Sequence, residues 1–102
     1  MTMTGKERAA LRGEANRLTA TVHVGHAGAN DSAVRSLDDV LRTHELVKAQ
    51  LSKQAGVKPN ELARQLAVST RSEVVQVIGR TATFYRPNPE LKRKDGTPPW
   101  RR

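Results

Sequence analysis

Two segments rich in β-branched and aromatic residues, 73–78 and 81–86, are separated by only Gly79 and Arg80. A two-residue connection favours a tight antiparallel hairpin, and glycine in its first position can adopt the backbone angles that such a turn requires. We therefore predict that the fold closes with two adjacent antiparallel strands. Any sheet that contains them cannot be purely parallel.

Three segments have the apolar spacing of amphipathic helices. Thr4 and Glu7 form the pattern of a capping box at the start of the first helix. Asn30 or Asp31 can cap the second helix, and Pro59 suits the first turn of the third. The predicted buried faces, in chain order, are Leu11, Ala15 and Leu18; Val34, Leu37, Val40 and Leu41; and Leu62, Ala63, Leu66 and Ala67.

Two further segments, 21–24 and 46–51, alternate apolar and polar residues and predict strands. In the second strand, Lys48 and Gln50 should point away from the buried face. The strand residues predicted as core are Val22, Val24, Val47, Ala49, Leu51 and the run 74–78. The element order is therefore α-β-α-β-α-β-β. This order predicts the α/β class, as an α+β sandwich with a four-stranded mixed sheet packed with helices.

The chain has 102 residues, enough for one domain with one modest core. We place this domain at residues 1–87. Segment 88–102 contains prolines and basic residues but little to bury, so we expect it to form a flexible tail. Trp100 is the one large aromatic residue in this tail that could dock on the domain.

The net charge is +8, of which +5 falls in residues 1–87 and +3 in residues 88–102. So large a surplus in a small domain indicates a polyanionic partner, with nucleic acid first and an anionic membrane surface second. The only aromatic residues are Phe84, Tyr85 and Trp100, too few for a surface that stacks successive bases on rings. Cysteine is absent and no segment resembles a signal peptide or a membrane span, so we expect a cytoplasmic protein.

The sequence Gly25-His26-Ala27-Gly28 joins a predicted strand to a predicted helix. Two glycines allow the backbone to approach a ligand closely, and the first turn of a helix favours phosphate. A G-x-x-G loop clamps the nucleic-acid backbone in KH domains by the same physics. On its own, however, the motif is more often an ordinary turn.

Other patterns do not support catalysis or metal binding. His23, His26 and His44 lack cysteine partners and form no complete metal-ligand motif. Asp38 and Asp39 are adjacent, so on a helix their carboxylates diverge. No nucleophile lies in a recognisable catalytic motif. We therefore expect no enzyme activity, no metal and no cofactor.

Several short motifs together resemble the stand-alone bacterial YhbY family, whose domain is also called CRM. The family's order and spacing are kept over residues 4–87. The matching motifs are Thr4-Gly5-Lys6, Val22-His23-Val24-Gly25, Glu45-Leu46-Val47-Lys48, Glu61-Leu62-Ala63, Val75-Gln76-Val77-Ile78-Gly79-Arg80-Thr81 and Tyr85-Arg86-Pro87.

This resemblance implies a fold similar to the C-terminal domain of the third translation initiation factor. It also implies binding to ribosomal RNA in precursors of the large ribosomal subunit, and a role in their assembly. Two positions depart from the family pattern. His26 stands where the family usually has lysine, which weakens a phosphate contact at neutral pH, and Arg71 stands where the third helix usually ends in glycine.

The candidate RNA-binding residues are Gly25, His26, Ala27, Gly28, Lys48, Arg80, Arg8, Arg12, Lys92, Arg93 and Lys94. Each of the charged residues could instead be a solvated side chain without a ligand. A protein–protein adaptor that binds ribosomal proteins or an assembly factor is the alternative function, and a duplex-DNA binder is a weaker third reading. We expect a monomer that associates with ribosomes.

Overall fold

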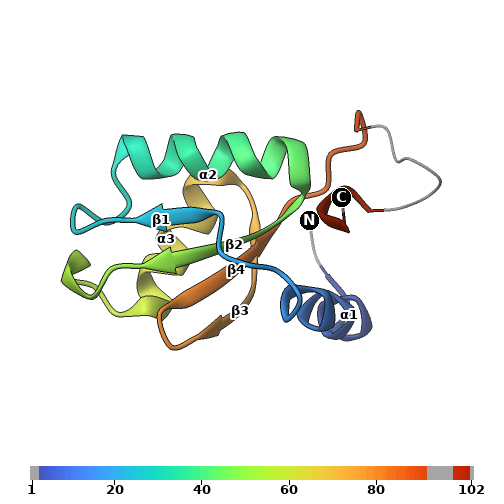
Figure 1. Cartoon of the computed structure of the whole chain (residues 1–102), viewed down its shortest axis with the longest axis horizontal. Helices are drawn as coiled ribbons and strands as arrows, with labels where there is room; N and C mark the ends of the chain where they lie inside the picture. Colours follow the sequence, from blue (N-terminus) through green and yellow to red (C-terminus); the bar gives the residue numbers. More distant parts are fainter. Residues whose placement is uncertain (1–2, 92–97, 102) are drawn as a thin grey trace.

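The structure is a computed structural model that describes residues 3–91 and 98–101, without the side chains of Gln54 and Arg101. Its helices and strands follow the predicted order (Figure 1). They are α1 (Gly5–Ala15), β1 (Val22–Val24), α2 (Asp31–His44), β2 (Leu46–Leu51), η1 (Lys53–Ala55), α3 (Pro59–Thr70), β3 (Glu73–Ile78), β4 (Thr81–Tyr85) and η3 (Pro99–Arg101). The predicted three helices and four-stranded mixed sheet are confirmed.

The four strands lie in the order β1-β2-β4-β3. β1 and β2 are parallel, whereas β4 is antiparallel to both of its neighbours, β2 and β3. The predicted two-residue turn joins β3 to β4, and Gly79 adopts a φ of +58° there. The register shifts between Val74 and Gln76, so Val75 is an extra residue that forms a β-bulge.

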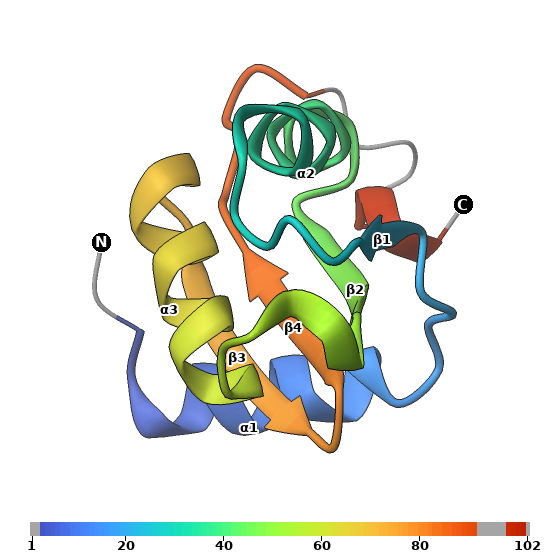
Figure 2. The same ribbon diagram turned by 90° about the vertical axis from the view of Figure 1, so that its left-hand side faces the viewer.

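The two faces of the sheet are covered differently. α2 and α3 pack on one face and enclose the main core, whereas α1 lies on the other side of the sheet (Figure 2). The main core includes the predicted residues Val22, Val24, Leu37, Leu41, Val47, Ala49, Leu51, Leu62, Ala63, Leu66 and Ala67, together with Ala82 and Phe84. A smaller cluster of Met3, Leu11, Leu46 and Val75 lies beneath α1.

The core prediction was wrong at two positions of β3. Gln76 is half-buried and belongs to neither core cluster, and Ile78 is 62% exposed. Ile78 pairs with Thr81 at the hairpin end of the sheet, on the face opposite the main core, where α1 does not extend. Val74 and Val77 do pack against the main core, which confirms the prediction for these two residues.

The helix ends follow the expected local chemistry. Thr4 and Glu7 form both hydrogen bonds of the capping box, and Asn30 Oδ1 accepts from the Ala33 amide at 2.9 Å. Arg71 ends α3 in the left-handed region with a φ of 57°. A side chain in that region costs on the order of 1 kcal/mol relative to glycine, so this departure from the family pattern carries a local cost in stability.

Arg86 connects the end of β4 to both helices of the main layer. Its Nη1 donates to Asp38 Oδ1 in α2 and to the Thr70 carbonyl at the end of α3, each at 2.7 Å. Its Nη2 donates to the Asp38 carbonyl at 3.2 Å. The side-chain hydrogen bond from Arg86, joined by a second one from Arg42, lowers the pKa of Asp38 below its ordinary value of 3.8.

The last described residues contact the domain. Trp100 packs against the cluster beneath α1, and its ring lies edge-on to Tyr85 with 6.1 Å between ring centroids. Pro99 is buried beside it. The division at residue 87 and the flexibility of the tail stay predictions. Trp100, the aromatic residue of the tail that could dock, contacts an apolar surface of the domain.

Trp100→Ala should lower the free energy of unfolding by about 2 kcal/mol, because a partly buried indole loses its apolar contacts and its ring pair. Urea denaturation of the full chain measures this change. Trp100→Phe, which keeps an aromatic ring, should recover most of the loss. Equal stability of Trp100→Ala and wild type would show that the end of the chain does not dock.

The lowered pKa of Asp38 predicts a defined acid sensitivity. Because the folded-state pKa lies below the unfolded-state value, the stabilisation by Asp38 is complete above about pH 4 and is lost as the pH falls through the folded-state pKa. Asp38→Asn should be less stable than wild type at pH 7, and its stability should fall less steeply below pH 4. Asp39→Asn, at an exposed neighbouring position whose ion pair with Arg42 is longer at 3.8 Å, should lose less stability at pH 7 than Asp38→Asn. Parallel profiles for wild type and Asp38→Asn would contradict this account.

Candidate nucleic-acid interface

Three connections meet at one end of the sheet. β1 and β2 are parallel, so the connections that follow them leave the sheet at the same end, and antiparallel β4 brings the β3–β4 turn to that end. The Ser52 amide donates to the Val24 carbonyl at 2.9 Å, and the Leu51 amide donates to the Arg80 carbonyl at 2.7 Å. We call segments 25–30, 52–58 and 79–80 the loop edge.

The two glycines of the G-x-x-G sequence have different structural roles. Gly28 closes a turn by donating its amide to the Gly25 carbonyl at 3.0 Å, and its φ is +67°. This backbone conformation explains Gly28 without a ligand. Gly25 has no positive φ, and an added Cβ would meet nothing within 4 Å. The fold therefore does not require glycine at position 25, just as it does not at Gly5 or Gly13.

The start of α2 is less favourable to phosphate than the sequence suggests. Asn30 already accepts from the Ala33 amide, and Asp31 places a carboxylate in the first turn. That carboxylate repels an anion and offsets the positive end of the helix dipole. His26 and Ala27 are exposed beside this turn, so their segment of backbone is accessible to a ligand.

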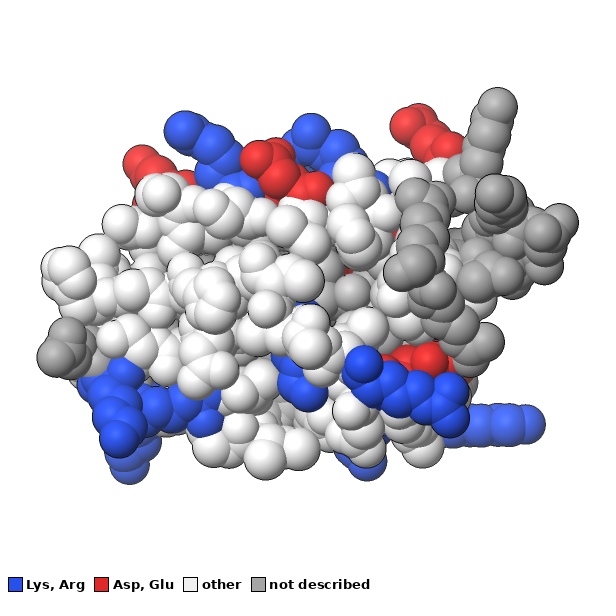
Figure 3. All heavy atoms as spheres, viewed as in Figure 1, with Lys and Arg blue, Asp and Glu red and all other residues white. Residues whose placement is uncertain are grey.

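Basic side chains gather at the loop edge. Lys53 in η1 and Lys58 at the start of α3 are exposed, and Arg80 in the β3–β4 turn is half-buried. Figure 3 shows Lys and Arg side chains together at the lower left, the end of the molecule to which these segments belong in Figure 1. The nearby carboxylate of Glu61 is paired with Arg64, and this hydrogen bond lowers the pKa of Glu61.

Sequence reasoning missed Lys53 and Lys58. Neither residue is near the G-x-x-G sequence along the chain, and neither belongs to a recognisable motif. The signal that could have found them is topological, because connections that follow two adjacent parallel strands emerge at the same end of a sheet. Recognition of β1 and β2 as a parallel pair would have placed residues 52–58 beside residues 25–30.

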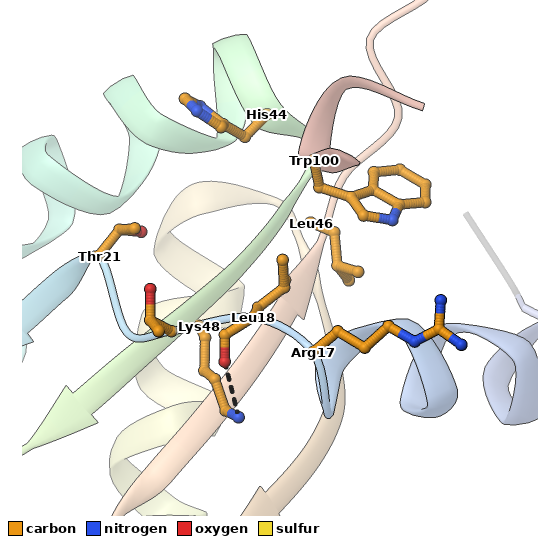
Figure 4. A pocket seen from close by; sticks show the side chains of 8 residues that line it. Arg17, Leu18, Thr21, His44, Leu46, Lys48 and Trp100 are labelled. Atoms are coloured by element: carbon orange, nitrogen blue, oxygen red, sulfur yellow. Dashed lines mark hydrogen bonds between the residues drawn. The ribbon is translucent and has the colours of Figure 1, made fainter. Parts of the chain in front are cut away.

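Lys48 faces away from the main core, as predicted, but its ammonium group has partners. Its Nζ donates to the carbonyls of Ala15 and Leu18, each at 3.2 Å. Figure 4 shows the bond to Leu18. Lys48 therefore holds the end of α1 against the sheet. Two of the three N–H donors of an ammonium group satisfy these bonds, which leaves one direction for a ligand.

Two other predicted basic residues, Arg8 and Arg12, lie away from the loop edge. Arg8 donates to the Val74 carbonyl beside the β-bulge and forms an ion pair with Glu73 at 3.6 Å, so it stabilises the edge strand β3. Arg12 is exposed on α1, which lies toward the opposite end of the sheet (Figure 1). Lys92, Arg93 and Lys94 lie outside the described residues.

A hollow of about 310 Å³ opens between the end of α1, the start of β2 and η3 (Figure 4). Its basic lining residues are Arg17, His44 and Lys48, and no acidic residue lines it in the part of the chain that the structure describes. Among residues 3–91 and 98–101, no three metal-ligating side chains gather in one place. No helix in the same part of the chain is long and apolar enough to cross a membrane.

Comparisons with known proteins agree with this architecture. The family model of the CRS1 / YhbY (CRM) domain matches residues 3–86. "Probable RNA-binding protein YqeI" of Bacillus subtilis is 33% identical over 90 residues, which cover 88% of this chain and 94% of the relative. "RNA-binding protein" of Haemophilus influenzae is 26% identical over 91 residues, 89% of this chain and 92% of the relative.

A solved structure has the same fold. The solution structure of the hypothetical protein SAV1595 from Staphylococcus aureus superposes with a TM-score of 0.75 at 34% sequence identity. The match covers 89% of this chain and 95% of that protein.

The different roles of the two glycines predict different effects on stability. Gly28→Ala should lower the free energy of unfolding by about 1 kcal/mol, because it places a Cβ in the left-handed region. Gly25→Ala should change it by less than about 0.5 kcal/mol, because the added methyl group meets open space. Thermal denaturation of both variants measures the difference. A loss at Gly25 as large as that at Gly28 would show that the fold itself requires both glycines.

Proposed function

The chain belongs to the CRS1 / YhbY (CRM) domain family, and we propose that it binds RNA through the loop edge. The observation that carries this proposal is the meeting of an unconstrained Gly25 with Lys53, Lys58 and Arg80 at one end of the sheet. An open glycine allows the backbone to approach phosphate, and the surrounding cations supply the sequence-independent attraction that dominates RNA affinity.

The charge distribution supports this choice of ligand. The chain carries a net charge of +8, and the carboxylate of Glu61 beside the loop edge is engaged by Arg64. Asp31 is the acidic residue closest in sequence to the G-x-x-G loop, so phosphate would meet Gly25, His26 and Ala27 rather than the start of α2. The relatives named above as RNA-binding proteins share this domain over nearly their full length.

The RNA that we propose is ribosomal RNA in precursors of the large ribosomal subunit, bound by a cytoplasmic monomer that assists assembly. This part of the proposal follows from the resemblance to the YhbY family. Ultraviolet crosslinking of the protein in growing cells, followed by sequencing of the attached RNA, tests it. Crosslinks concentrated in large-subunit precursors support the proposal, whereas crosslinks spread evenly over cellular RNA contradict the ribosomal part.

RNA affinity should fall steeply with salt. If six or more phosphates are contacted, the affinity drops by orders of magnitude between about 50 and 200 mM salt. The double variant Lys53→Ala/Lys58→Ala should reduce the salt slope by about two, because each lysine neutralises one phosphate. Fluorescence anisotropy with a labelled ribosomal RNA fragment measures both quantities.

Arg35→Ala and Gly25→Asp complete this experiment. Arg35 is exposed on α2 and lies outside the loop edge, so Arg35→Ala removes a positive charge but should leave the salt slope near that of wild type. Gly25→Asp should weaken binding strongly, since a carboxylate at that position repels phosphate. A flat salt response in wild type would overturn RNA binding and favour a protein–protein adaptor.

A further inference from the structure

The loop edge holds its basic side chains on a fixed backbone. The G-x-x-G turn lies against η1, since a Cβ added at Gly28 would be 3.8 Å from the Ala55 carbonyl oxygen. The segment after β2 is bonded to β1 through the Ser52 amide, and the β3–β4 turn is bonded to β2 through the Arg80 carbonyl. Backbone contacts thus join the three connections to one another and to the sheet.

Lys53, Lys58 and Arg80 carry the positive charge of the loop edge. Within the described part of the chain, none of these three side chains has a hydrogen bond or an ion pair. By contrast, Arg64 and Arg86 are paired with carboxylates. The segments of the loop edge contain no acidic residue. All three cations are therefore available to phosphate, and they project from a backbone that is already ordered.

The aromatic residues of the chain are all placed elsewhere. Phe84 is fully buried in the main core. Tyr85 pairs with Leu46 at the other end of the sheet, and its ring partner Trp100, in η3, lies at that end too (Figure 1). The ring that the loop edge does contain is the imidazole of His26. Proteins hold single strands by stacking successive bases on aromatic rings beside a basic groove, and one imidazole does not provide such a row.

The other contacts that the loop edge can make do not read bases. Residues 25–27 are exposed, and Gly25 and Ala27 present only peptide groups and a methyl group. Asn30 Oδ1 is used to cap α2. Peptide N–H groups and cations bind phosphate and sugar oxygens, which are the same in every RNA sequence.

We propose that the loop edge binds paired, A-form RNA through its phosphate backbone and does not read its sequence. The inference rests on the proposed function and names the class of RNA that the same site selects. A duplex presents its phosphates in a fixed array, so a fixed set of cations binds it without ordering either partner. A single strand loses conformational freedom when it matches the same cations, and the loop edge has no row of rings whose stacking offsets that loss.

Two RNA probes of equal length and equal nucleotide composition test this inference in wild type. One probe folds into a hairpin with a long paired stem, and the other has its nucleotides permuted so that it cannot pair. Because both carry the same number of phosphates, they do not differ in charge. In fluorescence anisotropy titrations, wild type should bind the hairpin about tenfold more tightly. The salt slope should be steeper for the hairpin, since each neutralised phosphate contributes about 0.9 in a double helix and about 0.7 in a single strand.

A second hairpin, with the base pairs of its stem reordered, tests whether sequence is read. It should bind within about threefold of the first hairpin, because the phosphate contacts are the same for both stems. A larger difference would show that base edges are read, which would overturn the inference.

The double variant Lys53→Ala/Lys58→Ala locates the preference for paired RNA. Both lysines are exposed and have no side-chain partner among the described residues, so the variant should keep the fold, which circular dichroism checks. It should lose most of the preference for the hairpin, whereas Arg35→Ala, which removes one exposed charge on α2, should keep it. A preference that survives in the double variant would show that paired RNA is held elsewhere on the protein.

The outcomes separate this inference from the proposed function. If wild type binds neither the hairpin nor the permuted strand, both fail. If wild type binds the permuted strand as tightly as the hairpin, or more tightly, this inference fails and the loop edge remains a contact for RNA. That comparison uses wild type alone, so it decides the matter even if the double variant does not fold. A preference for the hairpin that disappears in the double variant and persists in Arg35→Ala is the result that we expect.

Discussion

The pairing of β2 with a parallel neighbour on one side and an antiparallel neighbour on the other determines most of this structure. The parallel pair requires a crossover, and α2 supplies it while covering the main core. The antiparallel pair returns the chain so that the β3–β4 turn lies beside the two other connections. Arg86 holds both helices against the end of β4, since its guanidinium group donates to Asp38 in α2 and to the carbonyl of Thr70 at the end of α3. The candidate interface is thus a consequence of strand direction, and the helices keep it in place.

The sheet divides the molecule into a stabilising side and an exposed side. On the main-core side, apolar residues from β1, β2 and β4 are enclosed by two helices. On the other side, α1 protects one end only, and Lys48 holds it there through two backbone carbonyls. A lysine that might have served only as a surface charge therefore has a structural task. Its partners are backbone carbonyls, which every residue has, so the pattern of side chains in the sequence could not predict this contact.

The spacing of apolar residues predicted the order of helices and strands and most of the main core, because local spacing determines which residues of a helix or strand share a face. The Gly79-Arg80 connection predicted the hairpin. The main-core residues Ala33, Ala82 and Phe84 were not predicted. Three features could be recognised only in the tertiary structure. The contribution of Lys53 and Lys58 depends on which strands are neighbours. The contact of Arg8 with β3 joins residues far apart in the chain. The exposure of Ile78 depends on where α1 ends. The distinction between Gly25 and Gly28 also required backbone angles, since the two residues are equivalent in the sequence motif.

The β-bulge at Val75 determines which face of the sheet each later residue of β3 occupies. In a regular strand, an additional residue reverses the direction of every side chain that follows it. Here the additional residue is absorbed where it occurs, so Val74 and Val77 both reach the main core, and Val75 lies beneath α1. β3 therefore places side chains in the main core, in the cluster beneath α1 and, at Ile78, in solvent. Five of its residues pair with β4, and Val75 does not. β3 thus keeps its register with β4 on both sides of the bulge, and the unpaired residue, Val75, packs in the cluster beneath α1.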